Sequence, residues 1–195
     1  MKQKALITAV SVFALFTAFV SAQDASSAQK EPKTKLEAFE AKTGTVLIKG
    51  IQEMGSVAGI GSVSVDCREF TDANTGRKEY GITIEVKEAT ENARFERKET
   101  TLIDYDEIDS LLKGLDYIAK VDNSATALTS FEAIYKTKGD LRVATFSGGR
   151  EKVQAAIQSG RIRTATAFLS LDQLAKFRVL IASAKTKLDS IRKEK

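Results

Sequence analysis

Between residues 44 and 103, apolar and polar residues alternate in four short runs, which is the pattern of half-buried strands in an antiparallel sheet. The strictest alternation places Val63, Val65 and Cys67 on one face of a strand. Gly55, Gly59 and Gly61 follow the first run, and we expect them to mark a bend or bulge. The four predicted strands cover residues 45–50, 62–68, 80–87 and 94–103.

The spacing of the apolar residues changes after residue 103. They then recur every three or four positions, which forms one apolar stripe along a helix. Asp104 and Glu107 precede the stripe at the spacing of a capping box, in which each side chain bonds a backbone N–H group at the helix start. The stripe consists of Ile108, Leu111, Leu112, Leu115 and Ile118.

The same order of predicted elements recurs after residue 124. Four strand-like runs, separated by short turns, precede a longer amphipathic helix. Ser170 and Gln173 repeat the capping-box spacing at the start of this helix. The predicted strands cover residues 131–136, 141–146, 152–157 and 161–169. The apolar stripe of the helix consists of Leu174, Phe177, Leu180, Ile181, Ala184, Leu188 and Ile191.

These patterns predict an α+β fold of two ββββα units, in which antiparallel sheets are each covered by an amphipathic helix. The first unit spans residues 44–123 and the second spans 124–195, and we expect them to share one core. This element order resembles that of Whirly-type and PUR-type nucleic-acid-binding folds. The sequence contains no residue motif of either family, so the resemblance concerns element order alone and transfers no site residue.

Residues 1–22 have the composition of a secretory signal peptide, with a short basic start, an apolar run and small residues before the expected cleavage after Ala22. The run is short for the roughly 20 apolar residues that span a bilayer, which favours cleavage over the alternative of an uncleaved anchor. We therefore expect a secreted or periplasmic protein without an integral membrane span after signal removal. Residues 23–43 are predicted to be a flexible linker and lead-in.

The composition argues against several classes of enzyme. The chain has no histidine and one cysteine, which excludes Ser-His-Asp and Cys-His catalysis, histidine-ligated metals and an internal disulfide. Cys67 alternates with valines, so we expect it to be buried as a small hydrophobic residue. The formal charge of +4 falls to 28 − 26 = +2 without Lys2 and Lys4 of the predicted signal peptide. We expect no cofactor and no metal.

An acidic run at the start of the first predicted helix is the densest group of hard-cation ligands in the sequence: Asp104, Asp106, Glu107 and Asp109. The run lacks the glycine and the distal glutamate of an EF-hand loop. Acidic residues are also favoured at a helix N-terminus by the helix dipole. The second unit keeps the capping-box spacing at its helix start, but Asp172 is its one acidic residue there. We therefore interpret the acidic run as a helix start and not as a cation site.

Our first functional hypothesis is an exported, non-catalytic protein that binds an unknown protein or anionic ligand, with self-association left open. The alternative is a nucleic-acid or polyanion binder that uses basic residues on strands of the second unit. An enzyme that relies on Asp, Glu, Lys or Tyr has the least support.

The basic residues that carry the alternative hypothesis lie in the second unit. They are Lys136, Lys138, Arg142, Arg150, Lys152, Arg161 and Arg163. Phe131, Tyr135 and Phe146 are the candidates for stacking on bases, although Phe131 and Tyr135 share a strand face that can equally belong to the core. The competing interpretation is a solvated sheet face with interleaved charges.

Overall fold

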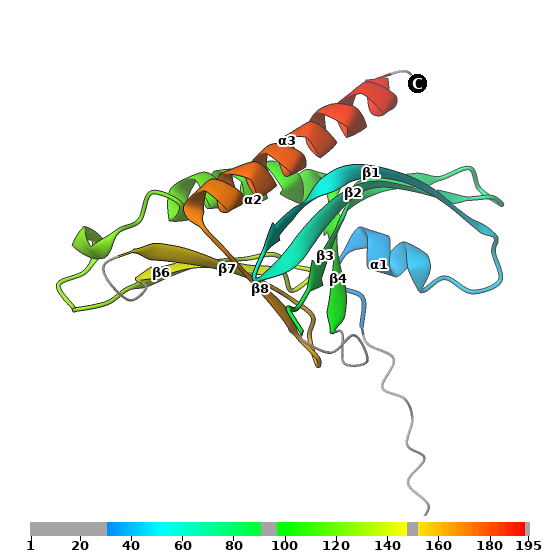
Figure 1. The fold of residues 1–195 in the computed structure, drawn as a ribbon. Helices are drawn as coiled ribbons and strands as arrows, with labels where there is room; N and C mark the ends of the chain where they lie inside the picture. Colours follow the sequence, from blue (N-terminus) through cyan, green and yellow to red (C-terminus); the bar gives the residue numbers. More distant parts are fainter. Residues whose placement is uncertain (1–30, 91–96, 148–151, 194–195) are drawn as a thin grey trace, which may run out of the picture. The chain divides into compact units, whose positions relative to one another are not determined.

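The computed structural model describes residues 31–90, 97–147 and 152–193 (Figure 1). The predicted signal peptide, residues 1–22, lies outside these residues. The first antiparallel sheet contains, in order, β1 (Leu47–Gly59), β2 (Gly61–Asp72), β3 (Lys78–Lys87) and β4 (Lys98–Asp104). The second contains β5 (Glu132–Lys136), β6 (Arg142–Ser147), β7 (Val153–Ser159) and β8 (Ala165–Leu169).

The helices precede, separate and follow these sheets. They are α1 (Lys35–Glu40), the 3-10 turn η2 (Tyr105–Glu107), α2 (Ile108–Ile118), the 3-10 turn η3 (Asn123–Ala125) and α3 (Leu171–Lys193). The α+β class and the two ββββα units are therefore confirmed. None of the helices among the described residues could span a bilayer.

Each long helix lies mainly against the sheet of the other unit. Helix α3, which follows the second sheet, packs chiefly on β1 and β2 of the first. Helix α2, which follows the first sheet, packs on β5 and β6 of the second and also touches α3. One cluster of buried apolar side chains consequently draws on both sheets and both helices. Neither unit can complete its core with its own helix alone.

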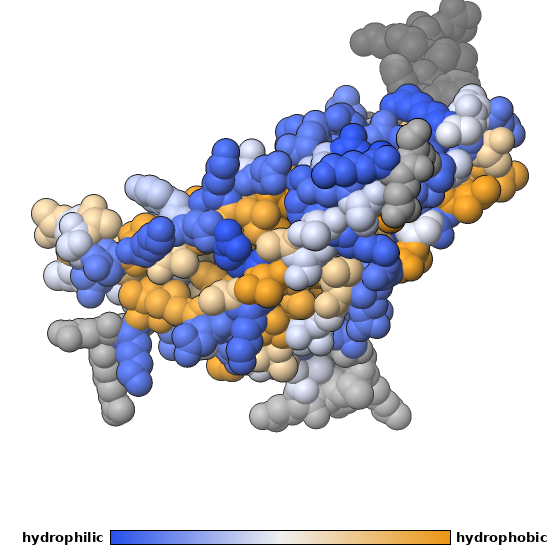
Figure 2. Space-filling view, turned by 90° about the horizontal axis from the view of Figure 1, so that it is seen from above, coloured by the Kyte–Doolittle hydropathy of each residue, from blue (hydrophilic) through white to orange (hydrophobic). Residues whose placement is uncertain are grey.

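The predicted apolar stripes form this core. In α2, Ile108, Leu111, Leu115 and Ile118 are buried. In α3, the buried residues are Leu174, Phe177, Ile181, Ala184 and Leu188. Figure 2 looks onto the side that carries these helices, where hydrophilic residues predominate and hydrophobic patches lie between them.

The glycines after the first predicted strand have the role that the sequence indicates. Strand β1 continues through Gly55 and ends at Gly59, with a register shift against β2 between Glu53 and Gly55 that marks a bulge, and Gly61 begins β2. The chain then turns sharply at Ile60, whose backbone exchanges two hydrogen bonds of 2.9 Å with Phe168 of β8. A side chain at Gly59 would collide with the carbonyl oxygen of Phe168. This close approach joins the hairpin of the first sheet to the edge of the second.

Helix α1 occupies part of the segment for which we predicted a linker and lead-in. Its first turn begins with a capping box in which Thr34 Oγ1 accepts from the N–H of Glu37 at 3.0 Å. Leu36 and Phe39 are buried and pack with Phe70 in a small second cluster. The helix thereby covers apolar side chains that the larger core does not reach.

The two predicted capping boxes have different outcomes. The one at α3 is confirmed, because Ser170 and Gln173 exchange backbone-to-side-chain hydrogen bonds of 2.7 and 3.2 Å. The one at Asp104 and Glu107 is wrong, since neither side chain caps its own helix. Their carboxylates bond backbone N–H groups of other elements instead, and a spacing of three residues could not reveal these distant partners.

Candidate functional site

The second sheet has one packed side and one side that faces solvent. Val143, Ile157 and Ala167 represent the packed side, where each is fully buried. The strand register places the alternate residues together on the other side, which we name the open face. It consists of Glu132, Ile134, Lys136, Arg142, Ala144, Phe146, Gln154, Ala156, Gln158, Thr166 and Phe168.

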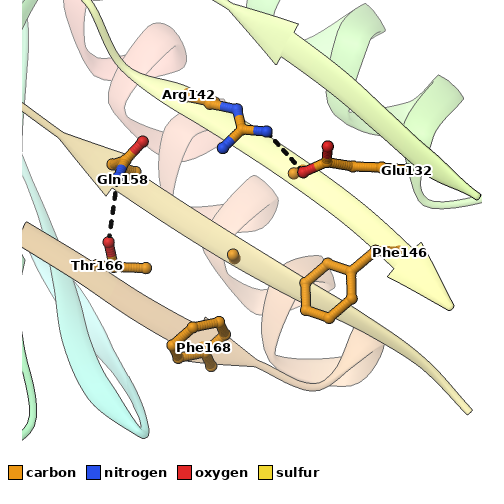
Figure 3. A pocket seen from close by; sticks show the side chains of 8 residues that line it. Glu132, Arg142, Phe146, Gln158, Thr166 and Phe168 are labelled. Atoms are coloured by element: carbon orange, nitrogen blue, oxygen red, sulfur yellow. Dashed lines mark hydrogen bonds and ion pairs between the residues drawn. The ribbon is translucent and has the colours of Figure 1, made fainter. Parts of the chain in front are cut away.

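A shallow hollow of about 490 Å³ lies on the open face. Phe146 of β6 and Phe168 of β8 stand on either side of β7 (Figure 3). Between them, β7 contributes Ala156, whose small side chain leaves the space open. Phe168 is 42% exposed, and Ile134 on β5 is equally exposed. The hollow therefore presents aromatic surface to a ligand.

Polar side chains form the other end of the hollow. Arg142 donates to Glu132 at 2.6 Å across β5 and β6, and Gln158 donates to Thr166 at 3.4 Å across β7 and β8 (Figure 3). The side chains of Arg142 and Glu132 are 34% and 46% exposed, so water screens their attraction and either can exchange it for a ligand. The hollow thus combines an aromatic end with donors and acceptors.

The predicted basic residues do not form one patch. Lys136 and Arg142 belong to the open face, while Lys152, directly before β7, lines a neighbouring hollow with Gln154 and Phe168. Lys138 lies in the turn between β5 and β6, and Arg163 is exposed in the connection before β8. Arg150 lies outside the described residues.

Arg161 has a structural position. Its side chain is only 12% exposed, and its guanidinium bonds both carboxylate oxygens of Glu37 at 2.8 and 2.9 Å and also pairs with Asp140. Asp140 in turn accepts from Lys33 at 2.8 Å. These contacts tie the N-terminal end of α1 to turns of the second sheet. Lys136, Arg142 and Lys152 are therefore the predicted residues with access to a ligand on the open face.

The structure also revises the set of aromatic residues. Tyr135 points to the packed side, where its ring lies against Gly114 of α2, and Phe131 precedes β5. Phe146 is on the open face, and Phe168 joins it there although we did not predict this. The available signal was the alternation of the strand. Phe168 lies two positions after Thr166, so its side chain points to the same side as this polar residue.

The acidic run of the first unit is divided among separate partners. Asp104 accepts from the N–H groups of Lys35 and Leu36, and Asp106 accepts from the Lys35 ammonium at 2.8 Å. The Lys35 hydrogen bond holds the pKa of Asp106 below its usual value. Glu107 Oε1 accepts from the N–H of Lys138 at 2.8 Å, while burial raises the pKa of this carboxyl. The run therefore acts as a set of tertiary contacts.

A cluster of titratable side chains surrounds Tyr105. Lys185 donates to the Tyr105 hydroxyl at 3.0 Å and to Asp189 at 2.7 Å, and the Arg192 guanidinium lies 3.7 Å from the centre of the Tyr105 ring. Although burial opposes it, the hydrogen bonds to Asp189 and Tyr105 raise the pKa of Lys185. These contacts join the C-terminal half of α3 to Tyr105 of η2.

Comparison with protein-family models, with curated proteins and with solved structures found no match. The open face of β5–β8 is the strongest candidate site on the described residues. It brings the exposed ring of Phe168, the partly exposed ring of Phe146, hydrogen-bonding side chains and nearby cations together around one hollow.

Proposed function

We propose that the protein is an exported, non-catalytic binding module and that the open face of β5–β8 holds its ligand. The observation that carries this proposal is the pair Phe146 and Phe168, which stand on the solvent side of a sheet whose other side is packed. Large aromatic side chains contribute most to stability when buried, so a pair held around an open hollow favours a role in binding. Export rests on the composition of residues 1–22.

The hollow suits a ligand that offers a flat or apolar group beside hydrogen-bonding groups. Such a group would rest on Ala156 between the two rings, while Gln158, Thr166 and Arg142 would meet the polar part. An exposed side chain of a protein partner has this chemistry. Aromatic and arginine residues are also the types that supply most of the energy at protein interfaces.

The test compares partner retention by variants of the open face. The full-length chain is immobilised and exposed to periplasmic extract or culture medium, and proteins retained by the wild type are quantified. We expect F146S and F168S to reduce retention by at least tenfold, since each removes one wall of the hollow. The matched control is I162S, which removes an apolar side chain that is 90% exposed but lies off the sheet. Equal retention by all variants would contradict the proposal.

A second candidate function, binding of single-stranded nucleic acid, is favoured by the cations beside the rings. Bases would stack on Phe146 and Phe168, while Lys136, Arg142 and Lys152 would contact phosphates. Three such contacts predict that affinity falls roughly 20-fold between 50 and 200 mM salt.

Fluorescence anisotropy with a labelled oligo-dT strand measures this salt dependence. K136Q and K152Q should each weaken binding several-fold, whereas K113Q, at an exposed position on α2, should not. Absence of binding at 50 mM salt would eliminate the nucleic-acid function and leave the protein-ligand proposal standing.

A further inference from the structure

Strand β1 is an edge strand with an accessible backbone. Among the described residues it pairs with β2 alone, and Figure 1 shows it at the margin of its sheet. Residues 48–53 are all exposed, including Ile48 at 56% and Ile51 at 61%. Exposed edges of this length are ready templates for pairing with another strand.

The hydrogen-bond pattern shows which residues face the free edge. Hydrogen-bonded and non-hydrogen-bonded residue pairs alternate along an antiparallel ladder. Val46 and Ala73 are a hydrogen-bonded pair, because the N–H of Ala73 donates to the carbonyl of Val46 at 2.9 Å. Counting from this pair in the β1–β2 register, residues 48, 50 and 52 bond to β2. Residues 47, 49, 51 and 53 therefore direct their N–H and C=O groups outward. Asp72, the partner of Leu47 in the register, supports this assignment. Its N–H donates to the carbonyl of Arg77 on the side of β3, and therefore not to β1.

The outward residues carry a self-complementary set of side chains. Two copies of β1 related by a two-fold axis at Ile51 would place Lys49 opposite Glu53 of the second copy, twice by symmetry. An axis at Lys49 or at Glu53 would instead oppose like charges. An axis at residue 50 or 52 would place a charged side chain opposite an apolar one or a glycine.

We infer that a second copy of this chain binds along β1, antiparallel and with its two-fold axis at Ile51. Three residue pairs then exchange two backbone hydrogen bonds each: Lys49 with Glu53, Ile51 with Ile51, and Glu53 with Lys49. Ile48 then lies opposite Met54 of the second copy. The two β1–β4 sheets become one continuous sheet, and the bulge after Glu53 ends the new ladder.

The charged side chains of this edge are free to change partners. Lys49 pairs with Glu40 of its own chain, but the two side chains are 42% and 40% exposed. Such a pair contributes little in water, so Lys49 can exchange it for Glu53 of the second copy. The inference is independent of the open face, which belongs to the other sheet.

Charge exchange tests the register. Sedimentation equilibrium of the full-length chain should show a monomer–dimer equilibrium, and K49E or E53K should each raise the dimer dissociation constant about tenfold by opposing like charges. The double variant K49E/E53K should restore the wild-type constant. A wild type that stays monomeric at 100 µM, or single variants that dimerise as well as the wild type, would overturn the inference.

Cysteine cross-linking tests the position of the axis. I51C should form a covalent dimer under mild oxidation, because the axis brings residue 51 of both copies together. I48C is the matched control: it has similar exposure in the wild type, yet its two copies would lie about 20 Å apart. Circular dichroism confirms that each variant is folded. Equal cross-linking of I51C and I48C would contradict the proposed pairing.

Discussion

The carboxylate of Asp104, at the end of β4, accepts a hydrogen bond of 3.1 Å from the backbone N–H of Leu36 in α1. The same carboxylate accepts from the N–H of Lys35 at 2.9 Å. Thr34 satisfies the next N–H group, that of Glu37, so three donors of the first turn are bonded. Asp104 thus caps a helix that lies far away in the sequence and fastens it to the first sheet.

Loss of this distant cap should destabilise the protein. We expect D104A to reduce the free energy of unfolding by about 1–2 kcal/mol, because two N–H groups of α1 lose their acceptor. Urea denaturation followed by circular dichroism measures the change. D106A is the matched control, since it removes only an ion pair with Lys35 whose side chains are 51% and 55% exposed. It should change stability by less than about 1 kcal/mol, and an equal loss in both variants would contradict the capping role.

Asp72 should make stability depend on pH. Its carboxylate accepts hydrogen bonds from Lys42 at 2.9 Å, from Thr45 at 3.0 Å and from the N–H groups of Asn74 and Thr75. The Lys42 hydrogen bond is the main reason that the pKa of Asp72 lies well below its usual range. A lowered pKa in the folded state stabilises the protein above the unfolded pKa of about 4, and this contribution is lost as pH falls toward the folded pKa.

The D72N variant isolates this contribution. It should be less stable than the wild type at pH 7, and the difference should shrink progressively between about pH 4 and pH 2, because Asp72 takes up a proton in the unfolded chain while it stays ionised in the folded protein. Urea titrations across this range measure the difference directly. A difference that stays constant with pH would show that the charge of Asp72 does not contribute.

Gly114 in α2 should resist replacement by alanine. Alanine normally stabilises a helix interior by about 1 kcal/mol relative to glycine. Here a Cβ would overlap the ring of Tyr135, which packs on this side of β5. We expect G114A to destabilise the protein by about 1–3 kcal/mol. In the Y135A background the same change should become neutral or stabilising, and an unchanged penalty there would point to another cause.

Cys67 should react slowly with thiol reagents in the folded protein. It is 4% exposed on β2, its Sγ lies 3.5 Å from the carbonyl oxygen of Ala184 in α3, and burial raises its pKa to about 11. The thiolate is the reacting species, so the folded protein at pH 8 should be modified far more slowly than the chain in urea. Absorbance with an aromatic disulfide reagent measures both rates, with C67A as the blank. Equal rates would contradict burial.

Local periodicity was sufficient to predict the elements of this fold. The alternation of Val63, Val65 and Cys67 and the helical stripe that includes Phe177 and Ile181 follow from the geometry of strands and helices. Burial of Cys67, the capping box at Ser170 and the bulge near Gly55 are also confirmed, because each depends on residues within a few positions.

Contacts between distant segments required the tertiary structure. No periodicity indicates that α3 covers β1 and β2, or that Asp104 reaches Leu36, since these depend on which surfaces meet after the chain has folded back. The same holds for the open face, where only the strand register brings Phe146 and Phe168 around Ala156. The sequence by itself therefore determined the elements and their inward sides, through local backbone geometry. Packing between the two units decided which helix covers which sheet and which side chains were left to face solvent.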